Sequence, residues 1–388
     1  MKKKIVILGS TGSIGKNTFN IIKKNKNSFE VVLLTTNKNI KEILKQTQKV
    51  KVRNILVNNK LYYLKIKKIL KNKNIKVYND INNIEKIVNK KIDYTMCSIT
   101  GLAGLKPTLD SIKFSKRIAI ANKEALICAW NLIEKELIKN KTEFIPIDSE
   151  HFSIWSLLND KSKKNIDKVI LTASGGPFLN KSKKFINHVN PKDALNHPNW
   201  KMGKKISVDS ATMMNKVFEV IEAKKIFNLE INKFKILIHP KSYLHAIIKF
   251  KNGLIKFLAH DTNMEVPIFN SIYLNENKIL KKYKIDLNKL NNLNLSEPNL
   301  KNFPVLKILK KVPKSNTLFE TILITANDQL VDYFLNKKIK YKDISAKLIK
   351  LINLKCFKKY SRIKPISFRQ INRLAQEVRL KTKELCIK

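Results

Sequence analysis

The sequence is poor in glycine, closely spaced cysteine, long apolar runs and acidic residues. Only nine of its 388 residues are glycine, whereas an average usage of about 7% would give roughly 27. A chain this poor in glycine is expected to keep it where a positive φ or a close approach to a ligand requires it. Eight of the nine lie at 9–15, 101–104, 175–176 and 203, so these segments are the first candidates for functional loops.

The four cysteines are far apart, which argues against a disulfide framework and against a zinc site built from thiolates. They are Cys97, Cys128, Cys356 and Cys386. No run of 18 apolar residues occurs, and the N-terminal Met-Lys-Lys-Lys leads directly into a short apolar run instead of the longer core of a signal peptide. These absences predict no membrane segment and a reducing, cytoplasmic location.

Acidic residues are also scarce: 30 of them face 78 lysines and arginines, which gives a net charge of +48. A concentrated basic patch would indicate nucleic-acid binding. Here the lysines are spread through nearly every expected element, and dispersed charge affects solubility and non-specific binding. We expect no specific nucleic-acid partner. A basic nucleic-acid-binding protein stays open as an alternative, which steep salt-dependent retention on DNA would favour.

Apolar periodicity predicts an α/β fold. In the first 150 residues, strands are expected at 4–8, 30–34, 54–57, 93–97, 117–120 and 143–147. Helix-like stretches separate them, which is the pattern of a Rossmann-like, doubly wound parallel sheet. We therefore predict a dinucleotide-binding domain over 1–150.

The strand signal continues more sparsely and then fades. Strands are expected at 168–172, 235–239, 244–250 and 254–258, mixed with a helix at 215–227, and they predict an α+β central catalytic domain over 151–290. Helices are expected at 302–311, 316–335, 342–351 and 367–383. A linker and a C-terminal helical bundle are accordingly predicted for 291–388.

The first glycine segment, Gly9-Ser-Thr-Gly-Ser-Ile-Gly15, follows a strand and opens a helix. Its glycines permit a tight turn, and the helix N-terminus offers free N–H groups to a pyrophosphate. An ordinary βα turn is the alternative. The second strand ends in Thr35-Thr-Asn-Lys-Asn39, with a lysine and no carboxylate, so the 2'-phosphate of NADPH is preferred over NADH. The loops 98–104 and 121–124 also lie at strand ends, although surface polarity explains the second loop equally well.

Paired carboxylates provide the metal signal. In an extended segment Asp148 and Glu150 would point the same way. Asn215, Lys216 and Glu219 share one helical face. Oxygen ligands of this kind suit Mg²⁺ or Mn²⁺. For Glu219 alone, a solvated helix position is the competing interpretation.

Two polar loops have the composition of a substrate site. Ser174-Gly-Gly-Pro-Phe178 is a strand end followed by a flexible turn suited to phosphate. His197-Pro-Asn-Trp200 and the residues up to Gly203 are typical of a mobile loop that could cover a substrate. His239 and His245 are interpreted as structural and not catalytic.

Taken in order, these segments resemble the 1-deoxy-D-xylulose 5-phosphate reductoisomerase family. The matching stretches include the glycine turn, Ala121-Asn-Lys-Glu124, Pro146-Ile-Asp-Ser-Glu-His151 and the twelve residues from Lys205 to Lys216. The likeness runs to about residue 250, thins, and returns at 303–306 and 325–328. Departures from the family pattern occur at Asn37, Lys241, Ala246 and Glu265.

The resemblance implies a homodimer that binds no membrane. It also implies NADPH-dependent rearrangement and reduction of 1-deoxy-D-xylulose 5-phosphate to 2-C-methyl-D-erythritol 4-phosphate, the second step of the non-mevalonate isoprenoid pathway. The expected NADPH contacts are Thr11, Gly12, Ser13, Ile14, Asn37, Lys38, Asn39, Asn122, Glu124 and Gly203. The expected Mg²⁺ or Mn²⁺ ligands are Asp148, Glu150 and Glu219. The sugar-phosphate substrate would contact Lys123, Ser149, Glu150, Ser174, His197, Ser210, Asn215, Lys216 and Glu219. The expected catalytic residues are Lys123, Ser149, Glu150 and Trp200.

Another NADP-dependent oxidoreductase is the nearest alternative, for example a semialdehyde dehydrogenase that shares the first glycine motif. Such an enzyme needs a nucleophilic cysteine. Neither Cys97 nor Cys128 has the helix-capping, base-adjacent setting that would activate a thiolate.

Overall fold

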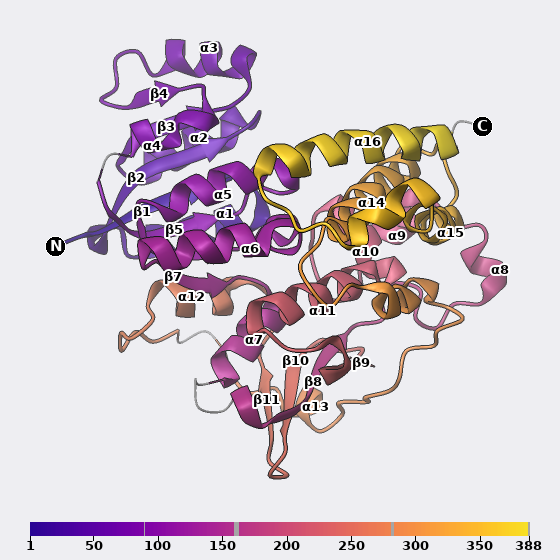
Figure 1. Ribbon diagram of the computed structural model, residues 1–388. Helices are drawn as coiled ribbons and strands as arrows, with labels where there is room; N and C mark the ends of the chain where they lie inside the picture. The colour runs from indigo at the N-terminus through magenta and orange to yellow at the C-terminus, as the bar shows by residue number, and fades with distance from the viewer. Residues whose placement is uncertain (89, 159–162, 281–282, 387–388) are drawn as a thin grey trace. The chain divides into compact units, whose positions relative to one another are not determined.

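The computed structural model describes residues 1–88, 90–158, 163–280 and 283–386, which form two compact units (Figure 1). The first unit comprises Met1–Ala125, Leu132–Phe152 and Met264–Lys282, and the second comprises Leu126–Asn131, Ser153–Asn263 and Tyr283–Lys388. Among the described residues, no helix is long and apolar enough to cross a bilayer. The three-domain division at residues 150 and 290 stays a prediction.

The first unit is built on a seven-stranded parallel sheet of order β4-β3-β2-β1-β5-β6-β7. Its strands are β1 (Lys3–Leu8), β2 (Phe29–Thr36), β3 (Val52–Val57), β4 (Lys76–Tyr78), β5 (Ile92–Cys97), β6 (Ser115–Ile120) and β7 (Glu143–Pro146). The doubly wound sheet is confirmed. The strand order reverses between β1 and β5, which is where such sheets bind ligands at the carboxyl ends of their strands.

Helices connect these strands. They are α1 (Ser13–Lys24), α2 (Ile40–Lys49), α3 (Lys60–Ile69), α4 (Ile84–Ile87), α5 (Leu105–Ile112) and α6 (Lys123–Asn140). A late segment, α12 (Glu265–Ile272), returns to the first unit and packs against α1. Lys24 pairs with Glu265 at 2.7 Å, and the Tyr94 hydroxyl lies 2.7 Å from the Ser271 hydroxyl. Polar contacts between distant residues therefore place α12 in the first unit, which local periodicity does not reveal.

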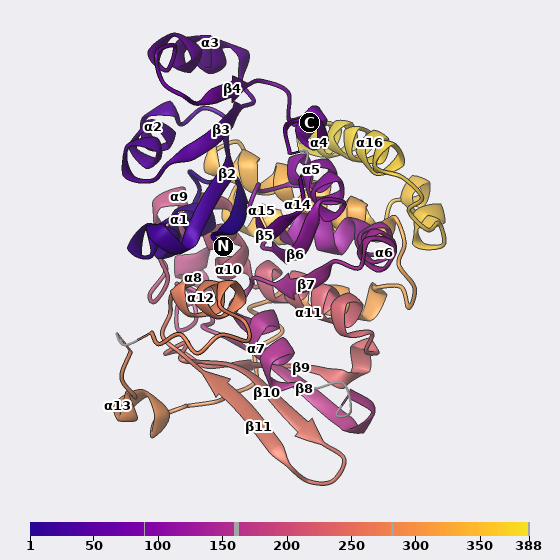
Figure 2. The ribbon, with the colours of Figure 1, turned by 90° about the vertical axis from the view of Figure 1, so that its left-hand side faces the viewer.

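The second unit contains a four-stranded sheet of order β11-β10-β8-β9. Its strands are β8 (Ile166–Ala173), β9 (Phe234–Ile238), β10 (Leu244–Phe250) and β11 (Ile255–Ala259). β10 is antiparallel to both of its neighbours, and β8 pairs with β9 in parallel. Figure 2 shows β11 at the outer edge, where Ile255 and Phe257 are 61% and 53% exposed.

Helices make up the remainder of the second unit. They are α8 (Lys183–Ile186), α9 (Pro191–Leu195), α10 (Lys204–Thr212), α11 (Met214–Phe227), α13 (Leu287–Leu290), α14 (Phe319–Leu335), α15 (Tyr341–Ile352) and α16 (Phe368–Cys386), while α7 (Ser149–Leu157) begins in the first unit. The last three helices pack together. The expected helix at 302–311 is a 3₁₀ helix instead, Pro304–Lys311. Its N–H groups donate to carbonyls three residues back, as Leu306 does to Phe303 at 3.2 Å, so its turns are tighter than those of an α-helix.

Candidate active site

The glycine turn forms the strand–turn–helix that its spacing predicts. Gly9 has φ +78°, and a Cβ there would lie 2.8 Å from the Ser98 carbonyl oxygen. A Cβ on Gly15 would lie 2.2 Å from the Gly9 carbonyl oxygen. Gly12 begins α1 with no side-chain cap, so the first N–H groups of this helix are directed to the turn. The turn is therefore shaped to hold an anion on backbone donors.

The second cofactor segment follows β2. The Thr11 hydroxyl lies 2.8 Å from that of Thr36, which joins the glycine turn to the end of this strand. Asn37, Lys38 and Asn39 are exposed, and the Asn39 side-chain oxygen Oδ1 accepts from the Glu42 N–H at the start of α2. The Lys38 ammonium is thus available to a phosphate beside the turn.

Asn122 connects two of the predicted loops. Its side-chain oxygen accepts from the Ala125 N–H at 2.7 Å and caps α6. Its amide nitrogen donates to the carbonyls of Ile99 and of Gly101, the latter at 2.9 Å. Surface polarity alone does not account for a residue that is 2% exposed and held by three hydrogen bonds.

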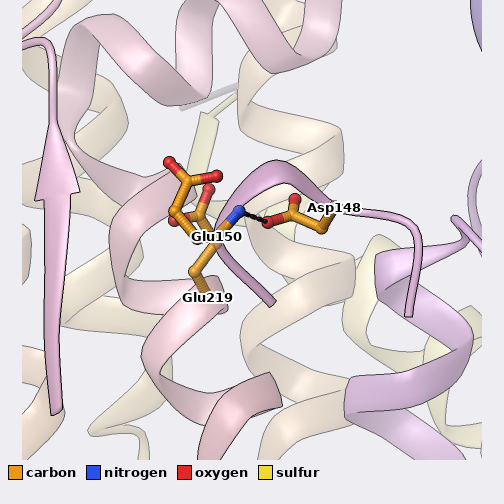
Figure 3. Close-up of side chains that lie close together, drawn as sticks. All are labelled: Asp148, Glu150 and Glu219. Carbon is orange, nitrogen blue, oxygen red and sulfur yellow. Dashed lines mark hydrogen bonds between the residues drawn. The ribbon is translucent and has the colours of Figure 1, made fainter. Parts of the chain in front are cut away.

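Asp148 is the centre of the polar cluster in the first unit. The Lys123 ammonium lies 2.9 Å from its Oδ2, and its Oδ1 accepts from the Glu150 N–H at 3.2 Å (Figure 3). His151 Nδ1 is 3.4 Å from the same oxygen, and Ser149 is hydrogen-bonded to Glu150. The prediction of an extended segment here was wrong. β7 ends at Pro146 and α7 begins at Ser149, so Glu150 lies in the first turn of a helix.

The third carboxylate, Glu219, lies in the second unit on α11. Asn215 donates to its Oε1 at 2.5 Å, and Lys216 forms an ion pair with it. The shared helical face is confirmed. Glu219 is 1% exposed and Lys216 is 4% exposed, so the interpretation of Glu219 as a solvated helix residue was wrong. The donor atoms of Asp148, Glu150 and Glu219 are carboxylate oxygens, which fit Mg²⁺ or Mn²⁺.

A cavity of about 940 Å³ in the second unit is lined by Ser174, Gly176 and His197. His197 Nε2 lies 3.0 Å from Ser174 Oγ, and Nδ1 of the same ring accepts from the Trp200 N–H at 3.0 Å. Burial lowers the pKa of His197 to about 4, so the ring is neutral at pH 7. Because Nδ1 is an acceptor, Nε2 carries the hydrogen. The cavity therefore presents an imidazole N–H beside a hydroxyl.

The 197–203 segment is a loop, as predicted, and it ends at Gly203, the N-cap of α10. Asn199 donates to the Ser242 hydroxyl at 2.9 Å, which ties the loop to the β9–β10 turn. The Trp200 ring meets His245 edge-on, with centroids 6.0 Å apart. The sequence predicts only a structural role for His245 and does not indicate this contact, because it contains no signal that the loop would reach β10.

Both candidate thiols in the sheet and in α6 are buried. Burial raises the pKa of Cys97 to about 12 and raises that of Cys128 as well. Neither thiol supplies a thiolate at neutral pH. The alternative of a cysteine-dependent dehydrogenase has no nucleophile at these two positions.

Comparison with known proteins is consistent along the whole chain. The family model of 1-deoxy-D-xylulose 5-phosphate reductoisomerase matches residues 5–130, and models of its C-terminal domains match 144–227 and 260–381. A 1-deoxy-D-xylulose 5-phosphate reductoisomerase of Pelagibacter ubique is 56% identical over 387 residues, covering 99% of this chain and 100% of the relative. One from the Wolbachia of Brugia malayi is 38% identical over 371 residues, covering 94% and 93%.

Solved structures give the same result. The reductoisomerase of Zymomonas mobilis in complex with NADPH superposes with a TM-score of 0.90 at 30% identity, covering 100% of this chain and 99% of that one. A DOX-P reductoisomerase in complex with NADPH, fosmidomycin and magnesium superposes with a TM-score of 0.92 at 30% identity, covering 98% of each.

Proposed function

The chain belongs to the 1-deoxy-D-xylulose 5-phosphate reductoisomerase family, and from that premise we propose which of its residues bind the cofactor, the metal ion and the substrate. The protein converts 1-deoxy-D-xylulose 5-phosphate to 2-C-methyl-D-erythritol 4-phosphate with NADPH and a divalent metal ion. The observation that carries this conclusion is the 56% identity to a reductoisomerase over 99% of the chain. The glycine turn and the buried acidic residue on α11 are consistent with it.

NADPH is proposed to lie on the glycine turn of the first unit. Thr11, Gly12, Ser13 and Ile14 would supply backbone and hydroxyl donors to its pyrophosphate. Lys38 would pair with the 2'-phosphate, next to Asn37 and Asn39. The remaining proposed contacts are Asn122, Glu124 and Gly203. Asn122 is so fully engaged in holding its own loops that its role is to shape the site.

Asp148, Glu150 and Glu219 are proposed to hold Mg²⁺ or Mn²⁺. When bound, the ion acts as a Lewis acid on the oxygens of the substrate, and NADPH supplies hydride to the rearranged aldehyde. Lys123 keeps an ammonium beside Asp148, which balances part of the acidic charge before substrate binds. Ser149 and Glu150 would lie near the reacting oxygens.

The substrate phosphate is proposed to bind Ser174, His197, Ser210, Asn215 and Lys216. Neutral His197 offers an N–H at Nε2, and the Lys216 ammonium supplies the positive charge that a phosphate dianion needs. Glu219 holds that ammonium and the Asn215 amide in place. The Trp200 ring would cover the bound substrate and exclude water from its reacting carbons.

We also propose a cytoplasmic homodimer that pairs through β11. This strand is the outer edge of its sheet, and Leu254, Ile255 and Phe257 are more than half exposed. An exposed apolar edge strand is a template for pairing with a second copy. Replacing Phe257 with Lys should shift the dimer to monomer in sedimentation experiments.

The reaction is tested by NADPH oxidation on purified protein with 1-deoxy-D-xylulose 5-phosphate, with and without Mg²⁺ or Mn²⁺. We expect substrate- and metal-dependent oxidation that falls at least about 100-fold in Asp148→Asn. Asp167→Asn is the matched control, because Asp167 pairs with Lys249 on the sheet surface. Folded protein that binds NADPH but oxidises none of it with this substrate would overturn the proposal.

A further inference from the structure

Two residues that have no part in the proposed reaction meet inside the second unit. One is Asp209, which lies within the Lys205–Lys216 stretch, and the other is Asn327 on α14. The Asn327 amide donates to Asp209 Oδ1 at 2.7 Å, and the two residues are 0% and 1% exposed. A buried carboxylate is costly unless it is paired, so this contact fixes where α10 lies against α14.

The second carboxylate oxygen of Asp209 is also held. The Lys205 ammonium lies 2.8 Å from Oδ2 of Asp209. It also lies 3.0 Å from Oδ1 of Asp328, which is the neighbour of Asn327. The same ammonium lies 4.9 Å from the centre of the Phe218 ring on α11. Asp209 and Lys205 thus join α10 to α14 by a hydrogen bond and an ion pair, and Lys205 also contacts α11 through the Phe218 ring.

The residue after Asp209 is Ser210, in the last turn of α10. Its backbone is confined on other sides too. A Cβ on Gly176 would lie 2.9 Å from the Ser210 carbonyl oxygen, and the Tyr341 hydroxyl donates to the Ala211 carbonyl at 2.7 Å. Met213 then takes a left-handed conformation with φ 64° and turns the chain into α11. A small rotation of α10 would therefore move Ser210 and redirect the turn before Asn215.

We propose that Asp209 and Asn327 are positioning residues that set Ser210 and the α10–α11 turn for the substrate phosphate. This inference rests on the phosphate role proposed for Ser210. The α14 helix then contributes to substrate affinity through a hydrogen bond, although neither Asp209 nor Asn327 is assigned a contact with substrate. Nine of the ten residues proposed to contact NADPH lie in the first unit, and the tenth, Gly203, lies at the opposite end of α10 from Ser210, so NADPH affinity should depend little on this pair.

Exchanging the two groups gives a test with an internal rescue. Asn327→Asp sets two carboxylates against each other, and we expect KM for 1-deoxy-D-xylulose 5-phosphate to rise about tenfold, since a small misplacement of binding groups has effects of this size. The NADPH dissociation constant, measured by fluorescence, should stay within about twofold. The double variant Asp209→Asn/Asn327→Asp restores an amide–carboxylate pair and should recover most of the KM. Asn336→Asp, at the exposed end of the same helix, controls for the charge change.

The parent enzyme is assayed in parallel, so its inactivity would count against the proposed function and not against this inference. A folded Asn327→Asp variant with unchanged KM would overturn the positioning role, as would equal losses of substrate and NADPH affinity. If that variant does not fold, Tyr341→Phe removes only the hydroxyl that holds Ala211. A KM raised about threefold there would support the role, and an unchanged KM would reject it.

Discussion

The two units build their candidate binding sites in different ways. In the first unit, the proposed cofactor turn is made of backbone: four residues, Gly9 to Gly12, lie between β1 and α1, and two of them are glycine. In the second unit, the cavity is lined by residues of the segment after β8, of α8 and α9, and by His197 and Pro198. In the same unit, buried charged pairs such as Lys216–Glu219 hold side chains that are proposed to bind the substrate. The backbone site depends on free space next to the glycine Cα atoms. The side-chain site depends on buried charged groups, each of which needs a partner of opposite charge.

The largest expected effect concerns a charged pair in the second unit. Lys225 pairs with Glu320 at 2.8 Å, and both side chains are at most 1% exposed. Lys225→Met leaves the Glu320 carboxylate buried without its ion-pair partner and should cost about 3 to 5 kcal/mol of unfolding free energy, measured with denaturant. The double variant Lys225→Met/Glu320→Leu should recover most of that loss. Equal stability of the single variant and the parent would contradict the picture of paired buried charges.

The next effect tests the backbone site. Gly15→Ala places a methyl group 2.2 Å from the Gly9 carbonyl oxygen, so NADPH affinity should fall about 100-fold in a fluorescence titration. Gly253→Ala is the matched change in the second unit. Nothing lies within 4 Å of its Cβ, and Gly253 belongs to the turn between β10 and β11, which supplies none of the proposed NADPH contacts. A loss as large as that of Gly15→Ala would show that crowding of the turn is not the reason.

Acid should destabilise the second unit in particular, since it holds five of the six histidines. Burial lowers the pKa of His260 to about 3 and that of His197 to about 4. Protonation is thus easier in the unfolded chain, so stability is full above pH ~6.5 and falls as the pH drops towards these values. Between pH 7 and pH 5, the parent should lose about 2 kcal/mol more unfolding free energy than His260→Gln loses. Equal losses in variant and parent, measured by denaturant unfolding at both pH values, would refute this.

The smallest effect should come from an exposed charge. Lys38→Ala should weaken NADPH binding by about fivefold and leave NADH binding unchanged, because a solvated ion pair contributes about 1 kcal/mol at most. Titrations of both nucleotides at one salt concentration would show it. Equal weakening of NADH binding would mean that Lys38 supports the conformation of the loop and does not bind the 2'-phosphate.

The same contrast explains what the sequence could predict. The glycine turn, the long strands of the parallel sheet and the Asn215–Glu219 face follow from residues close together along the chain, and all three are confirmed. The three-residue strand β4 was missed because it is too short to show alternation. Glu150 was placed in an extended segment because the start of α7 at Ser149 has no strong sequence signal.

Contacts between distant residues had no local signal at all. Nothing in Glu265–Ile272 indicates that it packs on α1, and nothing around Asp209 predicts an asparagine 118 positions later. The link from Trp200 to His245 likewise depends on how a loop folds back on a strand. Such pairs are fixed by burial of polar groups, which is a property of the folded chain.

The positions of the nine glycines can be explained from the space and the backbone angle at each one. Five of the nine, including Gly9 and Gly176, could not accept a methyl group without a contact of 2.9 Å or less, and two others, Gly101 and Gly253, have positive φ. Only Gly12 and Gly203 have both room and an ordinary backbone angle, and both begin helices at the proposed cofactor site. Neither crowding nor the backbone angle requires glycine at these two positions, so the proposed contact with NADPH is the physical reason that remains for a residue without a side chain.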